Sequence, residues 1–260
     1  MIAATPLPAV TALALRWTEV LAGAAVALAT LELLAVRRAF ADDGIWRWST
    51  LARELRWLRP VLAYRPFLAV LGVRFVAALL LLGGLRGPVA PVLWVTTLLV
   101  DVRFRGTYNG GSDLMTMVVL TSLVVAHVGG RSTVLVNAAL LYIAAQAMLS
   151  YFIAGVSKGT NGDWWRGDAL RQFVARPDFA TPAPVRRLLR RRGALIAASS
   201  AVIVFEVAFP VAFAGVPAAW VLVAMALLFH LGVVVVFGLN RFVLAWAASW
   251  PAVIYAARLL

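Results

Sequence analysis

The fold is decided by an uncharged stretch of sequence, TVLVNAALLYIAAQAMLSYFIAGV (residues 133–156). A helix needs roughly 20 mainly apolar residues to cross the hydrocarbon core of a bilayer, and this stretch provides them. The whole chain suits the same environment, because 63% of its 260 residues are hydrophobic and only 13% are charged. A soluble domain is about a quarter charged. The sequence therefore predicts an all-α, polytopic integral membrane protein.

Further apolar stretches predict a helical bundle of about eight transmembrane helices, forming a single membrane domain over residues 1–260. The expected spans are residues 10–35, 67–85, 88–102, 112–128, 133–156, 193–215, 217–237 and 241–259. The third is short, so a count of seven or nine is also open. The loops 36–66 and 157–192 are expected at the membrane interface, where the patterns near 44–60 and 163–176 predict amphipathic helices.

The 24 Lys and Arg residues give the chain a net charge of +13 and lie mainly between the apolar stretches. This placement favours contact with anionic lipid over contact with nucleic acid. Nineteen of them fall in one alternating set of loops, which includes 36–66 and 157–192, and four in the other set. The positive-inside rule then predicts a multi-pass protein of the plasma membrane, with the loop that contains Lys158 in the cytoplasm.

Cysteine and histidine usage limits the chemistry. The chain has no cysteine, which excludes disulfides and thiol redox chemistry. It has two histidines, His127 and His230. Two are too few for a histidine-rich metal or haem site, so no metal is expected.

An ionisable side chain within an expected span is costly and needs an explanation, and the residues considered are Glu19, Glu32, Arg74, Asp113, Glu206 and His230. In a structural interpretation Arg74 pairs with Glu32 or Glu206, and the others cap helix ends or extend toward the membrane interface. A functional interpretation makes His230 and Glu206, which lies beside the helix-kinking Pro210, part of a cavity or proton path. In YNGGSD (residues 108–113), either Ser112 or Asp113 is an ordinary helix N-cap, or Asn109 and Asp113 form the polar rim of that cavity.

Lys158 is the only lysine in the chain, and it follows the apolar run YFIAGVS (residues 151–157). One interpretation is a cation at the membrane edge that extends toward the headgroups. Arginine occupies such positions elsewhere in this chain, however. An ammonium can lose its proton when it is desolvated, whereas a guanidinium practically cannot. We therefore favour a second interpretation, in which Lys158 is a general base.

The segment YFIAGVSKGTNGDWWRGDAL (residues 151–170) closely resembles the core of the vitamin K-dependent gamma-carboxylase family, whose membrane region is called the HTTM domain. The matching positions are 151–156, Lys158, Asp163, Trp164 and Gly167. Weaker similarities at Asn109, Asp113, Glu206 and His230 extend the resemblance over roughly residues 100–255.

The resemblance implies quinol-linked chemistry of the epoxidation type. In that family a lysine deprotonates a reduced naphthoquinone, such as vitamin K or menaquinone, before oxygen converts it to an epoxide. The strong base so formed removes a glutamate proton, and CO2 adds. By resemblance the catalytic residues are Lys158 and His230, and the quinone-binding residues are Asn109, Asp113, Tyr151, Trp164, Trp165 and Glu206.

Two departures shape the expected function. Gly110 and Gly111 stand where the carboxylases have a histidine, and the sequence contains no counterpart of their large peptide-binding soluble domain. The chain is similar in length to short bacterial members that resemble the membrane component maturing a secreted sporulation-delaying toxin. Implied partners are membrane lipids, a quinone, a peptide and a small partner protein. Two alternatives stay open: a non-catalytic partner in peptide-toxin maturation or export, and a small proton-coupled transporter.

Overall fold

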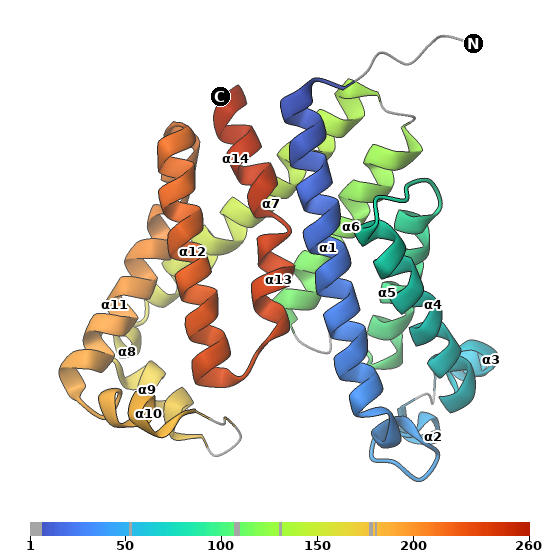
Figure 1. The fold of residues 1–260 in the computed structure, drawn as a ribbon. Helices are drawn as coiled ribbons and strands as arrows, with labels where there is room; N and C mark the ends of the chain where they lie inside the picture. Colours follow the sequence, from blue (N-terminus) through green and yellow to red (C-terminus); the bar gives the residue numbers. More distant parts are fainter. Residues whose placement is uncertain (1–6, 52–53, 107–109, 130–131, 177–178, 180) are drawn as a thin grey trace. The chain divides into compact units, whose positions relative to one another are not determined.

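The computed structural model describes residues 7–51, 54–106, 110–129, 132–176, 179 and 181–260, and every regular element within these ranges is a helix (Figure 1). Among them, seven are long and apolar enough to cross a membrane: α1 (Ala9–Ala35), α4 (Tyr64–Leu82), α6 (Gly110–Val128), α7 (Thr133–Gly159), α11 (Arg192–Ala208) continued by the 3-10 helix η3 (Phe209–Ala214), α12 (Val216–Phe237), and α13 (Arg241–Ala247) followed by α14 (Trp250–Leu259). The prediction of an all-α, multi-pass membrane protein is confirmed.

The short third span is also a helix, α5 (Val89–Arg103), but it has only 15 residues. At 1.5 Å per residue it is about 22 Å long, whereas a bilayer core is about 30 Å thick. Its length explains why it is not among the seven candidate spans, although the sequence expectation of a helix at this place is met.

The chain divides into two compact units. Unit 1 comprises Met1–Leu140 and Leu244–Pro251, and unit 2 comprises Leu141–Val243 and Ala252–Leu260. The divisions fall inside α7, α13 and α14, so these helices contribute residues to both units.

In unit 1, α1 packs against α4, α4 against α5, and α5 against α6. Gly23 lets α1 approach α4 closely, since a Cβ there would lie 2.9 Å from the carbonyl oxygen of Ala78. Arg74 of α4 is buried and donates hydrogen bonds to Thr30 Oγ1 at 2.9 Å and to Thr97 Oγ1 at 3.3 Å. It therefore links three helices, which supports the structural interpretation of this arginine.

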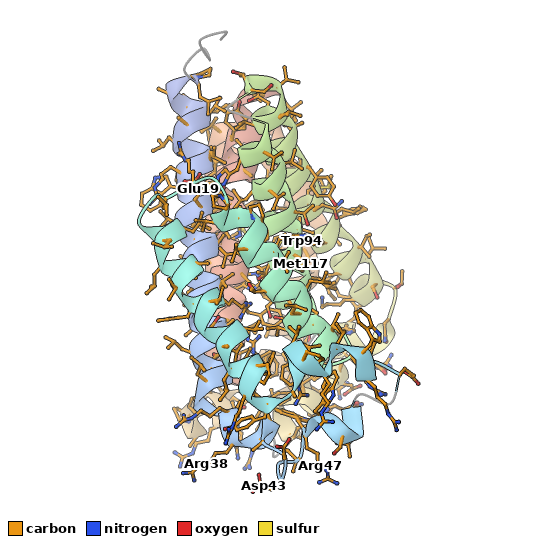
Figure 2. All side chains as sticks on the ribbon, turned by 90° about the vertical axis from the view of Figure 1, so that its right-hand side faces the viewer. Glu19, Arg38, Asp43, Arg47, Trp94 and Met117 are labelled. Carbon is orange, nitrogen blue, oxygen red and sulfur yellow. The ribbon has the colours of Figure 1, made fainter. Side chains whose placement is uncertain are left out.

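The loop 36–66 differs from its expected single amphipathic helix over 44–60. Its described residues, 36–51 and 54–66, form four short helices: η1 (Arg37–Phe40), α2 (Trp48–Leu51), η2 (Arg56–Leu58) and α3 (Arg59–Leu62). Leu55, the residue before η2, has φ −109° and ψ 26°, which lie outside the α-helical region, so one continuous helix does not run through this point. In Figure 2, Arg38, Asp43 and Arg47 mark this end of unit 1, and Glu19 lies toward the opposite end.

Apolar contacts hold this loop in place. Phe40 and Trp48 are buried in one hydrophobic cluster with Phe67 of α4. Arg103, fully buried at the end of α5, donates to the carbonyl oxygens of Trp46 at 2.7 Å and Leu62 at 3.1 Å. These long-range contacts override the helical period of the local sequence.

Unit 2 contains the C-terminal part of α7, then α8 (Gly162–Trp165), α9 (Asp168–Ala175), α10 (Ala183–Leu188), α11, η3 and α12. The helix expected over 163–176 is broken at Gly167, whose φ of 74° favours glycine and where a Cβ would lie 2.8 Å from Leu195 Cβ. The helix α9 ends at Ala175, and its expected terminator Pro177 lies outside the described residues.

The sixth span changes from α-helix to 3-10 helix at Phe209, one residue before Pro210. Proline has no N–H group to continue the α-helical hydrogen-bond ladder. The irregularity predicted beside Glu206 is therefore present, as a change of helix type.

Candidate functional site

One face of the C-terminal half of α7 carries the chemically active residues of unit 2. Tyr151, Gly155 and Lys158 stand at positions i, i+4 and i+7, which share one face of an α-helix. This face meets α11 at close range, because a Cβ on Gly155 would lie 2.6 Å from the backbone nitrogen of Val207 and 2.7 Å from Glu206 Cβ. The absence of a side chain at Gly155 thus brings Glu206 next to Lys158.

Lys158 and Glu206 form an ion pair. Lys158 Nζ donates to both carboxylate oxygens, at 2.9 Å to Oε1 and 2.7 Å to Oε2. The side chain of Glu206 is 3% exposed and that of Lys158 is 20% exposed, so the pair is largely shielded from water. As one ammonium faces one carboxylate, the pair is formally neutral. Lys158 also stands in the last turn of α7, where a cation interacts favourably with the helix dipole.

The two tryptophans of α8 differ in their contacts. The ring of Trp164 lies 5.4 Å from Lys158 Nζ, within the range of a cation–π interaction. The indole N–H of Trp165 donates to the carbonyl oxygen of Gly159 at 2.8 Å, and this side chain is 44% exposed. Trp164 therefore adjoins the ion pair, whereas Trp165 satisfies a free carbonyl group at the end of α7.

A second polar contact lies two turns before Lys158 on α7. Tyr151 Oη is 2.8 Å from His230 Nε2 of α12, and both side chains are buried. The tyrosine ring packs against Phe209 with centroids 4.1 Å apart and against Phe205 with centroids 5.4 Å apart. The contact is thus a polar pair inside an aromatic surround.

The sequence-predicted site residues fall into three groups. Lys158, Tyr151, Trp164, Glu206 and His230 lie together in unit 2, with Trp165 adjacent in α8. Asn109 lies outside the described residues.

Asp113 lies in unit 1, in the first turn of α6. The helix begins at Gly110, so neither Ser112 nor Asp113 occupies the N-cap position considered from the sequence. A carboxylate in the first turn still stabilises the positive end of the helix dipole.

Sequence reasoning missed residues that position the site. Gly155, Phe205 and Phe209 have no chemistry of their own, and only their place against Tyr151 and Glu206 gives them a role. Only Gly155 could have been found from the sequence, because its spacing from Lys158 places both residues on one face of the helix.

No sequence pattern indicates the polar cluster of unit 1. The fully buried Glu19 carboxylate accepts from Arg16 Nη1 at 3.1 Å and Arg86 Nε at 3.0 Å, and His127 Nε2 lies 2.9 Å from it. The His127 side chain is only 3% exposed. The partners stand far apart in the chain, so the ionisable residue types alone do not reveal the contact.

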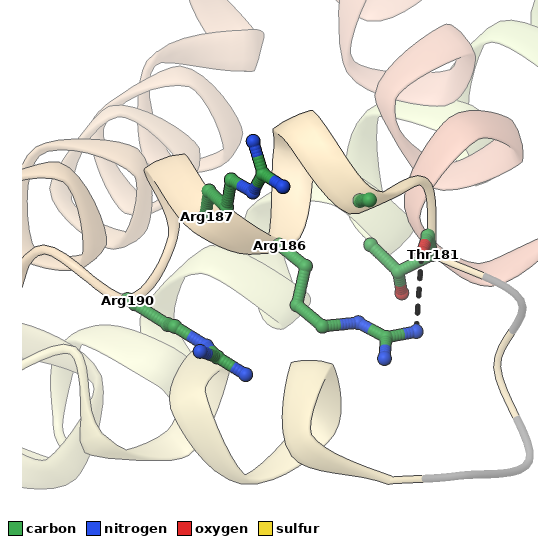
Figure 3. A pocket seen from close by; sticks show the side chains of 5 residues that line it. Thr181, Arg186, Arg187 and Arg190 are labelled. Carbon is green, nitrogen blue, oxygen red and sulfur yellow. Dashed lines mark hydrogen bonds between the residues drawn. The ribbon is translucent and has the colours of Figure 1, made fainter.

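A basic pocket of about 260 Å³ in unit 2 is lined by Thr181, Ala183, Arg186, Arg187 and Arg190 (Figure 3). Arg186 donates to the carbonyl oxygen of Thr181 at 3.1 Å. Thr181 Oγ1 in turn donates to the Val236 carbonyl oxygen at 2.7 Å, which ties one wall of the pocket to α12. Guanidinium groups suit a phosphate oxygen, so contact between this basic segment and phospholipid headgroups stays a prediction.

Within the described ranges, no group of three or more His, Cys, Asp or Glu side chains is placed to hold a metal ion. Unit 2 brings together an ion pair, a tyrosine–histidine contact and aromatic rings. No known protein family, curated protein or solved structure matches this chain.

Proposed function

We propose that this protein is a membrane-embedded enzyme that carries out quinol-linked chemistry of the vitamin K epoxidation type, with unit 2 as its site. The observation that carries the proposal is the shielded Lys158–Glu206 ion pair, which lies against the ring of Trp164. Ionisable groups inside a membrane span are costly and mark functional sites by default. The resemblance of residues 151–170 to the gamma-carboxylase family supports the same substrate class.

The residues of unit 2 suit a reduced naphthoquinone. Tyr151, Phe209 and Trp164 offer ring faces for stacking, and Tyr151 and His230 offer hydrogen-bonding groups within that surround. When bound, such a quinol supplies an acidic hydroxyl group and the reducing equivalents that dioxygen removes.

The ion pair serves as the proton acceptor. A proton passes from Lys158 Nζ to Glu206 across 2.7 Å and leaves a neutral amine, which then takes the proton of the substrate hydroxyl. After the transfer Glu206 is protonated and Lys158 is an ammonium again, so it stabilises the negative charge left on the substrate oxygen. A guanidinium cannot make the first transfer, which accounts for lysine at this one position.

The target that we propose for the oxidised product is a peptide presented by a small partner protein, on the strength of the resemblance to short bacterial HTTM proteins. A second candidate function is proton-coupled transport. The buried charge pair within a span favours it, since transport pathways use such pairs as relays.

The decisive experiment compares Lys158→Arg with wild type. Arginine keeps the positive charge and the partner of Glu206, so the variant should fold and melt like wild type in mild detergent. We expect it to lose epoxide formation from a reduced menaquinone analogue, measured by mass spectrometry of the reaction mixture. If Lys158→Arg keeps full activity, Lys158 is not the general base.

Two further measurements separate the candidate functions. Lipids and quinones that co-purify in mild detergent should include menaquinone or its epoxide, and a preparation with only phospholipid would count against the enzyme. A transporter reconstituted in vesicles should lose proton-coupled uptake with Glu206→Gln yet tolerate Lys158→Arg, whereas the proposed general base should be inactivated by both substitutions.

We further propose that the Lys158 loop faces the cytoplasm, on the basis of the asymmetric loop charge. Ser49 and Ala183 are exposed, and the chain has no native thiol. Cysteines at these two positions should resist an impermeant thiol reagent in intact cells and react after the cells are opened. If both cysteines are labelled in intact cells, the Lys158 loop lies outside the cytoplasm and the proposed orientation is wrong.

A further inference from the structure

The polar cluster around Glu19 in unit 1 contains more cationic groups than its single carboxylate needs. Both terminal nitrogens of Arg16 have acceptors, since Nη1 bonds Glu19 and the Leu81 carbonyl oxygen and Nη2 bonds the Leu82 carbonyl oxygen. Those carbonyl groups belong to the last turn of α4, where the Gly84 N–H also bonds the Leu81 carbonyl oxygen and Arg16 supplies a donor for that of Leu82. Arg16 therefore has a structural role, as the C-terminal cap of α4.

Arg86 and His127 are used only in part. Arg86 bonds Glu19 through Nε, and its side chain is 35% exposed, which leaves the two terminal nitrogens for another acceptor. The His127 side chain is 3% exposed, and its Nδ1 has no hydrogen-bond partner among the described residues. Because a carboxylate only accepts hydrogen bonds, His127 Nε2 carries the hydrogen toward Glu19, and Nδ1 of the neutral ring is an acceptor.

Both side chains line the same cavity. It has a volume of about 210 Å³, and its other lining residues are Leu7, Leu15, Gly87, Ala126 and Val136. Apolar walls with two polar groups are the usual composition of a small-molecule site, and the volume is below the range of about 300–1,000 Å³ for larger ligands. The cavity thus suits a compact apolar body with one polar group.

The chemistry of that polar group follows from its two neighbours. Arg86 requires an acceptor, and the free nitrogen of His127 requires a donor. A hydroxyl group satisfies both, whereas a carboxylate would direct a lone pair at His127 Nδ1. We propose that this cavity in unit 1 binds a small apolar alcohol or phenol, with its hydroxyl between Arg86 and His127. This site is distinct from the proposed quinol site of unit 2 and does not depend on it.

Glu19 positions both binding residues. Its carboxylate holds the His127 ring through Nε2 and the Arg86 guanidinium through Nε, both on Oε1. The carboxylate behind the ring fixes the tautomer that leaves Nδ1 as acceptor, as second partners of functional histidines commonly do. The same arrangement makes the imidazole a stronger hydrogen-bond acceptor for the ligand hydroxyl.

The test uses 2-naphthol, a compact two-ring phenol, with the full-length protein in mild detergent. Binding is measured by equilibrium dialysis against protein-free micelles, so that partition into detergent is subtracted. We expect 2-naphthol to bind about tenfold more tightly than naphthalene, which lacks the hydroxyl, and more tightly than 2-naphthoate. Equal affinity of 2-naphthol and naphthalene would overturn the site, and preference for naphthoate would overturn the hydroxyl assignment.

Two variants locate the binding. His127→Gln keeps a donor for Glu19 near the position of Nε2 but removes the acceptor at Nδ1, so affinity for 2-naphthol should fall about tenfold. Ala126→Leu fills the cavity and should abolish binding. Gly72→Ala is the matched control, since a Cβ there meets nothing within 4 Å. If His127→Gln does not fold, Ala126→Leu decides, and wild-type binding by a folded Ala126→Leu protein would refute the proposal.

Discussion

Glu19 in unit 1 and Glu206 in unit 2 are both buried carboxylates inside candidate membrane spans, yet their charge is compensated differently. Glu19 has two guanidinium partners and an imidazole, whereas Glu206 has one ammonium partner. The first cluster carries excess positive charge and the second is formally neutral. A cluster with a spare guanidinium donor and an imidazole acceptor suits the binding of a hydroxyl group, and a neutral pair suits the transfer of a proton.

The helix contacts beneath the two carboxylates are alike. Gly23 in α1 and Gly155 in α7 each let a neighbouring helix approach so closely that a Cβ would lie under 3 Å from its backbone. Small residues of this kind commonly form helix contacts within membranes. The difference between the clusters therefore comes from the number of charged partners, which mutations can change one at a time.

The largest effect is expected where a carboxylate loses its only cation. Lys158→Ala leaves Glu206 uncompensated at 3% exposure, so we expect the free energy of unfolding to fall by about 3 kcal/mol or more. Reversible unfolding in mixed micelles measures this quantity. The double variant Lys158→Ala/Glu206→Gln should recover most of the loss and remain inactive. If Lys158→Ala is as stable as wild type, the buried charge of Glu206 does not need Lys158 for its compensation.

A smaller effect is expected from separating the partners by steric means. Gly155→Ala places a Cβ 2.6 Å from the backbone of Val207, and helix separation should cost about 1–3 kcal/mol. Gly159→Ala is the matched control on the same helix, because its Cβ would meet only Ile203 Cγ2 at 3.4 Å. Equal thermal melts of the two variants would show that α7 and α11 do not pack as closely as described.

Removal of one cation from the other carboxylate should cost less. Arg86→Ala leaves Glu19 with Arg16 and His127, so we expect a loss of about 1 kcal/mol in the free energy of unfolding. The same reversible unfolding assay allows a direct comparison with Lys158→Ala. A loss as large as that of Lys158→Ala would mean that the two carboxylates are compensated alike, and the distinction between the clusters would fail.

The fold was largely predictable because its signal is local. Apolar stretches such as 133–156 dictate helices in a solvent that cannot bond free backbone groups. The loop 36–66 was not predictable in the same way. Its structure depends on Phe40 and Trp48 packing against Phe67, and on Arg103 bonding carbonyl groups far away in sequence.

The candidate site was predictable in its residue types but not in its pairings. The single lysine drew attention to Lys158, and its partner Glu206 stands 48 residues away on another helix. For Arg74, the sequence suggested an acidic partner, and the structure adds hydrogen bonds to two threonines. Glu19 contacts His127, which is 108 residues away in the sequence. A contact between such distant residues cannot be predicted from the periodicity of either helix.

The smallest effect on stability is expected for an ion pair of unit 2 that is exposed to water, Asp163 with Arg166. Arg166 Nη2 lies 2.5 Å from Asp163 Oδ1, closer than any contact of Lys158, but their side chains are 57% and 50% exposed. Exposed pairs contribute little, because water screens the charges and the long side chain loses entropy when it is held. We expect Asp163→Asn to change the free energy of unfolding by less than about 0.5 kcal/mol in the same assay. The Asn161 cap remains in this variant, since it bonds the backbone N–H of residue 163. A loss comparable to that of Lys158→Ala would show that shielding from water is not what distinguishes the Lys158–Glu206 pair.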